Sequence, residues 1–342
     1  MSSMRAVVMH EQGAPSVLRV ERVPVPHIAP HEVLLKVGSV GVSYHDVVER
    51  NGAYRHTIKL PMIIGYEIAG TVERVGQQVA TLKVGDRVCA KPFYSCGLCR
   101  RCRNGLETAC AQRQPVRGGY AEYVALPEET LARIPDALSF DVACMIGAST
   151  GVALNAVRDT AKVQLGESVL ITGASGGLGL PSIELARAAG AMVIAVTRSA
   201  GKRESLLSIG AHHAIVAPDG RDFAAEAKEL TGGEGVDVVI DNVGSRVFTP
   251  SFRSLAIGGR YAFVGQLYRE DIAFNPALIF FKRAQLLGVG SVRRDQLHDA
   301  IRLVAAGRAN PHVATIMPLE AAADAHALVE AGGQIGRVVL QP

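Results

Sequence analysis

The pattern of apolar and polar positions divides the chain into a strand-rich first part and a later part of alternating strands and helices. In the first part, the apolar runs 4–9, 33–37 and 68–75 predict strands, and prolines and glycines separate them. Residues 84–90 add a Gly-Asp turn and another strand, and residues 41–51 predict a strand end followed by a short helix. We therefore expect a turn-rich β domain with pairing between distant segments.

The later part predicts an α/β domain. A helix-rich stretch, 139–157, leads into it, and residues 317–339 predict one helix and a closing strand that return to the first domain. Alternation of the two element types is typical of a doubly wound parallel sheet. The strands are expected at 169–172, 192–196, 214–216, 236–240 and 261–264, with helices at 180–189, 221–230, 246–255 and 296–306.

Composition narrows the class of protein. The 342 residues are 48% hydrophobic, which suits about two domains with ample core. The net charge of +4 comes without a block of Lys and Arg, so no nucleic-acid partner is expected. Neither a signal peptide nor a membrane-spanning run is recognisable, and we expect a cytoplasmic protein that acts on a small molecule.

A glycine-rich turn lies between the predicted strand at 169–172 and the helix that follows. Its sequence, Thr172-Gly-Ala-Ser-Gly-Gly-Leu-Gly179, matches G-x-G-x-x-G except that Ala174 replaces the first glycine. Such a turn brings backbone N–H groups and a helix N-terminus to a dinucleotide pyrophosphate. An empty tight turn is the alternative, but the flanking strands and helix favour a cofactor site. The residues expected to bind are Ala174, Ser175, Gly176, Gly177 and Leu178.

The end of the second predicted strand indicates which dinucleotide binds. An NAD site usually has a carboxylate there, about 20 residues after the glycines. This chain instead has Thr197, Arg198 and Ser199, followed by Lys202. Cations at a helix N-terminus are unfavourable without a partner, although a solvated basic face is the alternative. The pattern favours NADP(H), whose 2′-phosphate suits Arg and Lys.

Four of the six cysteines crowd into one loop with the spacing C-x2-C-x2-C-x7-C. Four thiolates can enclose a tetrahedral zinc ion and leave no open position, so such a site is structural. Reduced free thiols or an iron–sulfur cluster are the alternatives. The candidate ligands are Cys96, Cys99, Cys102 and Cys110.

Taken together, these landmarks resemble the medium-chain dehydrogenase/reductase family over the whole chain. The matching segments are GVSYHD (41–46), GYEIAGTVERVG (65–76), VGDRV (84–88), the cysteine loop, GGYAEYV (118–124), TGASGGLG (172–179) and VDVVIDNVG (236–244). The resemblance implies a chaperonin-10-like β catalytic domain, 1–155, a Rossmann domain, 156–292, and a return to the catalytic domain, 293–342. It also implies a zinc ion in the cysteine loop, a homodimer or homotetramer, and cofactor contacts from Gly265, Gln266 and Arg293.

The departures from the family concern its catalytic zinc site. Zinc alcohol dehydrogenases resemble this chain but have a Cys at Ser43 and a His at Tyr66, and their third ligand aligns near Ile146. A hydroxyl, a phenol and an alkyl group do not make a zinc site. We therefore expect one structural zinc and no catalytic zinc.

Zinc-free members of the family pass hydride from NADPH to activated double bonds, which implies an enoyl, enone or quinone reductase here. Tyr66, His45 and Ser43 then become the candidate catalytic residues, because a neutral phenol donates a hydrogen bond and an imidazole supplies a proton. The alternatives are that Tyr66 only fills space, that His45 caps a backbone group and that Ser43 is a small buried residue. For the whole protein, the alternatives are an alcohol dehydrogenase or aldehyde reductase, and a non-catalytic NADPH-binding protein.

For other residues near these motifs we expect structural roles. Asp46 is expected to be structural, Glu67 to pair with a basic residue, and Cys89 and Cys144 to be core thiols. A basic group beside the catalytic segment suits either an anionic substrate or solvent. It consists of Arg50, Arg55, His56 and Lys59.

Overall fold

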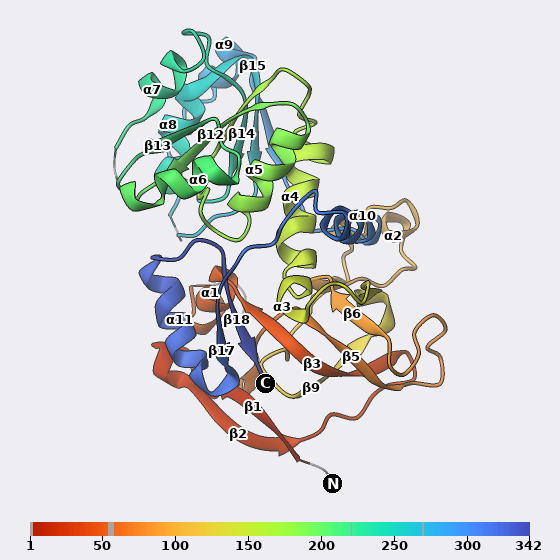
Figure 1. The fold of residues 1–342 in the computed structure, drawn as a ribbon. Coiled ribbons are helices and arrows are strands. Elements are labelled where there is room, and N and C mark those ends of the chain that lie inside the picture. The colour runs from red at the N-terminus through yellow and green to blue at the C-terminus, as the bar shows by residue number, and fades with distance from the viewer. Residues whose placement is uncertain (1–2, 54–57, 220, 269) are drawn as a thin grey trace. The chain divides into compact units, whose positions relative to one another are not determined.

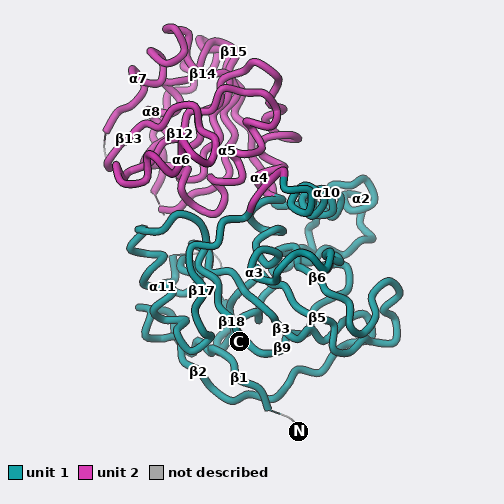
Figure 2. Tube along the Cα trace, viewed as in Figure 1, with its two compact units in different colours: residues 1–151, 291–307, 311–342 teal, residues 152–290, 308–310 magenta. Residues whose placement is uncertain are grey.

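The computed structural model describes residues 3–53, 58–219, 221–268 and 270–342. The chain forms two compact units, coloured separately in Figure 2. The first unit comprises residues 1–151, 291–307 and 311–342, and the second comprises 152–290 and 308–310. The boundaries expected from the sequence, 155/156 and 292/293, fall a few residues later than these.

The main sheet of the first unit joins segments that are far apart in the sequence. Its path over the described residues is β10–β6–β5–β3–β18–β17, and β9 also pairs with β3. The closing strand β18 lies antiparallel to β3, so the end of the described chain returns to this unit (Figure 1). The strands are β3 (Glu32–Val42), β5 (Glu67–Val75), β6 (Arg87–Ala90), β9 (Tyr123–Pro127), β10 (Leu131–Arg133), β17 (Val313–Pro318) and β18 (Arg337–Gln341).

Smaller sheets and short helices complete the first unit. Its core is apolar, with Leu35, Ile68 and Leu340 fully buried. One small sheet has the order β2 (Leu18–Pro24), β1 (Ser3–Met9) and β4 (Met62–Ile63), and another pairs β7 (Phe93–Tyr94) with β8 (Gln114–Pro115). The helices are α1 (Tyr44–Arg50), α2 (Arg100–Arg103), α3 (Phe140–Ala143), α10 (Arg294–Ala305) and α11 (Ala322–Ala331).

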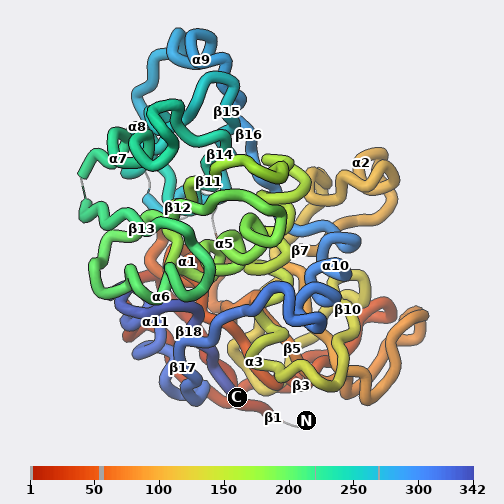
Figure 3. The backbone as a smooth tube through the Cα atoms, turned by 45° about the horizontal axis from the view of Figure 1, so that its top comes forward, coloured from red at the N-terminus to blue at the C-terminus, as the bar shows by residue number. Residues whose placement is uncertain are grey.

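The second unit is a parallel sheet with helices between its strands, and Figure 3 follows this alternation along the chain. The strand order is β13–β12–β11–β14–β15–β16. The strands before β11 in this order and those from β14 onward extend the sheet to opposite sides while all strands stay parallel, which confirms the predicted Rossmann sheet. The strands are β11 (Ser168–Ile171), β12 (Met192–Thr197), β13 (His213–Val216), β14 (Val236–Asp241), β15 (Leu255–Phe263) and β16 (Gln285–Gly288). The helices include α5 (Gly179–Ala188), α6 (Arg203–Ile209), α7 (Ala224–Glu229), α8 (Ser245–Ser254) and α9 (Ala277–Lys282).

The elements that the sequence pattern did not predict include β2, β16, β17, α6 and α9. Strand β16 has only four residues, Gln285–Gly288, and lies at the edge of its sheet, so it carries no alternation that a pattern could detect. Strand β15 also begins earlier than expected, at Leu255 rather than at residue 261.

One helical run, Phe140–Thr160, is long and apolar enough to cross a membrane when judged by length and composition alone. Within it, 78% of the most apolar window is buried inside the protein. This burial is typical of a core helix, and it agrees with the helix-rich stretch expected at 139–157.

Candidate functional site

The glycine turn lies where β11 ends and α5 begins. Gly173 has a φ of +57°, and a Cβ on Gly179 would collide with the Gly173 carbonyl and the Ala174 backbone. Gly176 is different, because a Cβ there would meet only the Gly173 oxygen, at 3.4 Å. The space around Gly176 therefore suits close approach of a ligand, while Gly179 brings helix and strand together.

A buried carboxylate holds the strand ends beneath this turn. Asp241, the last residue of β14, accepts hydrogen bonds from the hydroxyls of Thr172 (2.6 Å) and Tyr261 (2.7 Å) and from the N–H groups of Val243 and Gly244. Burial raises the pKa of Asp241, and these donors partly offset the shift. Sequence reasoning missed this residue, because its donors come from three separate segments.

The basic residues after β12 gather beside the glycine turn. Lys202 Nζ lies 3.3 Å from the Ser175 hydroxyl, and Arg198 forms a 3.3 Å ion pair with Asp219. The pKa of Lys202 is lowered by burial and by the nearby Arg198. Thr197 and Ser199 contact each other through a 3.3 Å side chain–backbone hydrogen bond. Two cations held this close suit a bound anion such as a ribose phosphate.

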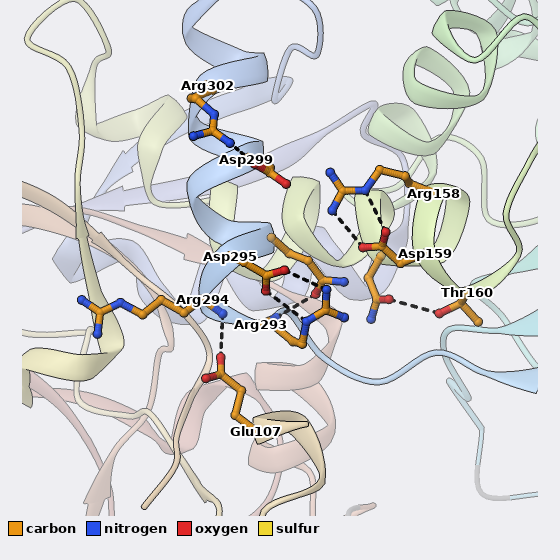
Figure 4. Close-up of polar contacts among 11 residues, drawn as sticks. Glu107, Arg158, Asp159, Thr160, Arg293, Arg294, Asp295, Asp299 and Arg302 are labelled. Carbon is orange, nitrogen blue, oxygen red and sulfur yellow. Dashed lines mark hydrogen bonds and ion pairs between the residues drawn. The ribbon is translucent and has the colours of Figure 1, made fainter. Parts of the chain in front are cut away.

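The remaining predicted cofactor residues have other contacts. Gly265 is close to the Asn242 backbone, and Gln266 accepts a 2.7 Å hydrogen bond from Ser245 N–H at the start of α8. Arg293 belongs to the first unit and forms a two-pronged ion pair with Asp295, at 3.0 and 2.9 Å (Figure 4).

The four loop cysteines form a compact cluster. Their sulfur atoms all lie within 4.8 Å of one another, with closest separations of 3.5 to 4.0 Å. Tetrahedral zinc–thiolate bonds of about 2.3 Å place sulfur atoms about 3.8 Å apart, so this donor set fits zinc. Backbone N–H groups of Cys99 and Leu98 lower the pKa of the Cys96 thiol to about 6. The cluster therefore suits a structural zinc ion.

A fully buried lysine anchors the cysteine loop. Lys91 Nζ pairs with Glu129 at 2.7 Å and with Glu107, inside the loop, at 3.3 Å. Glu107 also accepts a 2.6 Å hydrogen bond from the Arg294 N–H at the start of α10 (Figure 4). The loop is thus tied both to the sheet and to α10. The sequence gives no signal for Lys91, because its two partners are 16 and 38 positions away in the chain.

The candidate catalytic residues meet at the N-terminus of α1. The Ser43 hydroxyl donates to Asp46 Oδ2 at 2.7 Å and also shares a hydrogen bond with Tyr66. The Tyr66 ring packs edge-on against His45 with centroids 4.8 Å apart. Tyr66 and His45 are half-buried, while Ser43 and Asp46 are buried. The structure therefore brings together the three residues that the sequence singled out.

Burial and charge set the protonation of these groups. Burial and the carboxylates of Glu67 and Asp46 raise the pKa of Tyr66 well above its ordinary value. Burial also lowers the pKa of His45, so its imidazole is neutral near pH 7. Tyr66 is thus a neutral phenol that can donate a hydrogen bond.

The third position of the family's catalytic metal site is apolar. Ile146 is fully buried, and the buried Cys144 thiol donates to the Asp141 carbonyl at 3.3 Å. Glu67 is fully buried and pairs with Arg337 at 2.9 Å, as a partner of opposite charge was expected to do. Among the described residues, the cysteine loop is the one group of three or more metal-ligating side chains close enough to hold an ion.

One expectation for the basic group near α1 is wrong. Arg50 is not on a surface, because its side chain is buried and pairs with Glu330 of α11 at 2.6 Å. This partner is 280 positions away, so the local pattern could not reveal it. Lys59 is exposed, and Arg55 and His56 lie outside the described residues.

Two family models match separate parts of the chain. The model described as an alcohol dehydrogenase GroES-like domain matches residues 29–136. The model described as a zinc-binding dehydrogenase matches residues 177–306. The first match covers the strand-rich part with the cysteine loop, and the second covers most of the parallel sheet.

Relatives of known activity match nearly the whole chain. An acryloyl-coenzyme A reductase from Sulfurisphaera tokodaii is 31% identical over 99% of this chain and 100% of its own. A quinone oxidoreductase from Rattus norvegicus is 31% identical over 98% of this chain and 97% of its own. An NAD-dependent alcohol dehydrogenase from Sulfolobus acidocaldarius is 32% identical, with 99% of both chains covered.

Solved structures share the fold. The crystal structure of AibC superposes with a TM-score of 0.92 at 40% identity, over 99% of this chain and 96% of that one. A structure of a zinc-binding dehydrogenase from Sinorhizobium meliloti bound to NADP gives a TM-score of 0.88 at 28% identity, with 100% of both chains covered.

Proposed function

The chain belongs to the medium-chain dehydrogenase/reductase family, and we propose that it is an NADPH-dependent reductase of activated carbon–carbon double bonds. The substrate class is an enoyl thioester, an enone or a quinone. The observation that carries the proposal is the hydrogen-bonded group of Tyr66, Ser43 and Asp46 at the position of the family's catalytic zinc ligands. A zinc Lewis acid is replaced there by a neutral hydrogen-bond donor.

Tyr66 has the chemistry that this reaction needs. Hydride addition to a conjugated double bond leaves negative charge on the carbonyl oxygen, and a preorganised donor stabilises that charge. The phenol of Tyr66 stays protonated because burial and the nearby Glu67 carboxylate raise its pKa. His45 packs edge-on against the Tyr66 ring and is neutral, so it can orient the phenol without placing a positive charge beside the phenolic proton. Acryloyl-coenzyme A reductases and quinone oxidoreductases among the relatives support this substrate class.

The cofactor assignment rests on the second unit. NADPH supplies a hydride when it is bound. The backbone from Ala174 to Leu178 would hold the pyrophosphate, and Arg198, Ser199 and Lys202 would hold the 2′-phosphate. The short distance from Lys202 to Ser175 and the repulsion between Lys202 and Arg198 support this placement. Gly265, Gln266 and Arg293 are proposed as secondary contacts, and the structural zinc would be held by the cysteine loop.

An alcohol dehydrogenase or aldehyde reductase is the second candidate function. The NAD-dependent alcohol dehydrogenase relative, which matches nearly the whole chain, favours it. This reaction has to activate an alcohol without the Cys and His donors replaced by Ser43 and Tyr66, which makes it the weaker candidate.

The decisive experiment measures NADPH oxidation with acryloyl-CoA, an α,β-unsaturated ketone, a quinone and a simple aldehyde. We expect turnover with at least one of the first three and much less with the aldehyde. Tyr66→Phe removes the donor and should lower kcat by about 10²–10³. Tyr123→Phe, at a half-buried tyrosine in the same unit, is the matched control and should leave kcat unchanged. Aldehyde reduction that survives Tyr66→Phe would favour the second candidate.

Cofactor choice is tested separately by titration. The wild-type protein should bind NADPH more tightly than NADH. Lys202→Ala should raise the Kd for NADPH about tenfold while leaving the Kd for NADH unchanged, because the variant loses a contact with the 2′-phosphate, which NADH lacks. Lys228→Ala, in α7, is the control. Equal affinity for both dinucleotides in the wild type would contradict the assignment.

We also propose a cytoplasmic homodimer or homotetramer. Large apolar side chains on and near α9 are exposed in the single chain, including Phe280 (64%) and Phe281 (70%). Edge strand β16 follows directly and leaves one side of the sheet unpaired among the described strands. Light scattering of the purified protein gives the mass, and a monomer would contradict the proposal.

A further inference from the structure

Asp46 has an uneven hydrogen-bonding environment. Its Oδ2 atom accepts from the Ser43 backbone N–H at 2.8 Å and from the Ser43 hydroxyl at 2.7 Å. Its Oδ1 atom is buried and has no hydrogen-bond partner among the described residues. A carboxylate oxygen without a donor is poorly stabilised away from water, so this environment favours the neutral carboxylic acid.

Neighbouring negative charges also favour the neutral form of Asp46. The carboxylates of Glu49 and Glu67 face Asp46, and with burial they raise its pKa to about 7, although the Ser43 hydrogen bonds oppose the shift. Glu67 is paired with Arg337, and Glu49 with Arg117 through a 2.8 Å contact to Nε. The other titratable or charged groups around α1 are His45, Arg50, Tyr66, Tyr120, His326 and Glu330.

We propose that Asp46 is a buried proton reservoir for Tyr66, connected to it through the Ser43 hydroxyl. This inference rests on the proposed function. The three groups form one hydrogen-bonded line from the fully buried carboxyl to the half-buried phenol. The 2.7 Å contact between Ser43 Oγ and Asp46 Oδ2 can carry its proton on either oxygen. Asp46 does not touch substrate, so it is a positioning residue.

The proposed steps conserve protons and electrons. Two electrons reach the substrate with the hydride, which forms the new C–H bond and leaves an enolate. Tyr66 gives its phenolic proton to the enolate, the Ser43 proton moves to the Tyr66 oxygen, and the Asp46 proton moves to the Ser43 oxygen. Asp46 is left as a carboxylate. After product release, one proton from water returns along the same three groups and restores the acid.

A purely structural role for Asp46 makes a different prediction. Ser43 is the N-cap of α1 and Asp46 is its N3 residue, so the pair also forms a capping box. A cap needs only a hydrogen-bond acceptor at position 46, which asparagine also supplies. A proton reservoir needs a titratable group there, which asparagine is not.

The test compares Asp46→Asn with the wild type, using the substrate that is turned over fastest in the NADPH oxidation assay. Asp46→Asn should lower kcat about tenfold to a hundredfold, while KM and the Kd for NADPH change less than about twofold. The wild-type kcat should fall as pH rises through about 7, and Asp46→Asn should lose that limb. Ser43→Ala combined with Asp46→Asn should be no slower than Ser43→Ala alone, because both act on one path.

Asp86→Asn is the matched control. Asp86 accepts from the backbone N–H three residues earlier, Lys83, at 2.9 Å, as Asp46 does from Ser43. The Asp86→Asn variant should leave kcat and the pH profile of kcat unchanged. A wild-type pH profile retained by Asp46→Asn would overturn the proposal, as would additive losses in the double variant.

A second readout does not depend on activity. In protein labelled with 13C-carboxyl aspartate, the resonance that disappears in Asp46→Asn should titrate near neutral pH and shift in Ser43→Ala. Titration at the ordinary pH of an aspartate would overturn the reservoir. If no activated double bond is reduced but this resonance behaves as expected, the proposed function fails while the proton path stands.

Discussion

The first unit contains two positions where this family places metal ions, and they differ in chemistry. The cysteine loop presents four sulfur atoms within 4.8 Å of one another. The second position presents a hydroxyl, a phenol and an alkyl group from Ser43, Tyr66 and Ile146. We propose that this fold has kept a metal site built within one loop and converted a site assembled from three distant segments.

The difference also concerns how charge is handled. Four thiolates need a cation in their centre, and a bound zinc ion would supply it. The proposed converted position has the buried acidic side chains of Asp46 and Glu67, and it handles them by two separate means. Glu67 is paired with Arg337, which partly offsets the rise that burial causes in its pKa, whereas the environment of Asp46 favours the neutral acid. In this proposal, one position is stabilised by a bound zinc ion and the other by an internal ion pair and a bound proton.

Breaking the cysteine loop should have the largest effect. Cys99→Ser combined with Cys102→Ser leaves only two thiolates and should reduce zinc from one ion per chain to nearly none, because a zinc site needs at least three protein donors. Elemental analysis after extensive dialysis measures this. Cys89→Ala removes a buried core thiol instead and should keep the zinc. Zinc retained at one per chain in the variant that lacks both thiols would contradict the assigned ligands.

Breaking the ion pair at the converted position should come next. Arg337→Met leaves Glu67 buried without its partner and should lower the free energy of unfolding by about 3–5 kcal/mol. Replacing both residues, Glu67→Met with Arg337→Met, should restore most of the loss. Urea denaturation of the three proteins measures the difference. If the double variant is as unstable as the single one, the pair is not the stabilising feature.

The bound proton of Asp46 predicts a pH dependence of stability. Its pKa is raised from 3.8 to about 7 on folding, so the folded state holds the proton more tightly than the unfolded state. This contribution is fully present below about pH 4 and is lost as pH rises through about 7, by on the order of 4 kcal/mol. Asp46→Asn should therefore gain stability relative to the wild type between these pH values. A constant difference in unfolding free energy across that range would contradict the shift.

Partial restoration of the metal donors should have the smallest effect. Ser43→Cys with Tyr66→His supplies two ligands, but Ile146 remains an alkyl group, and zinc needs at least three protein donors. Zinc content should stay at one per chain. A second zinc in this double variant would show that a further donor, such as Glu67, completes the site. A second zinc in the wild type would show that the position was never converted.

The sequence predicted features whose residues are neighbours along the chain. The glycine turn from Gly173 to Gly179 and the cysteine loop are local, and their spacing reflects the geometry directly. The alternating elements also predicted the parallel sheet, although the short edge strand β16 carried too little pattern to detect.

Contacts between distant residues could not be predicted in this way. Arg50 looked like a surface cation because it ends a short helix, but its partner Glu330 lies on α11. Lys91 and the Tyr120–His326 hydrogen bond, at 3.0 Å, are likewise buried polar contacts that only the fold creates. A pattern shows which residues are polar, whereas their pairing depends on which elements pack together.

The position of β18 bears on how the protein is made. Strand β18 lies inside the main sheet of the first unit, between β3 and β17, and carries Arg337 to Glu67. The second unit, apart from residues 308–310, is one continuous segment, 152–290. During synthesis its parallel sheet can form while the ribosome is still adding residues. The main sheet of the first unit cannot be completed beside β3, nor can Glu67 pair with Arg337, until residues 337–341 emerge.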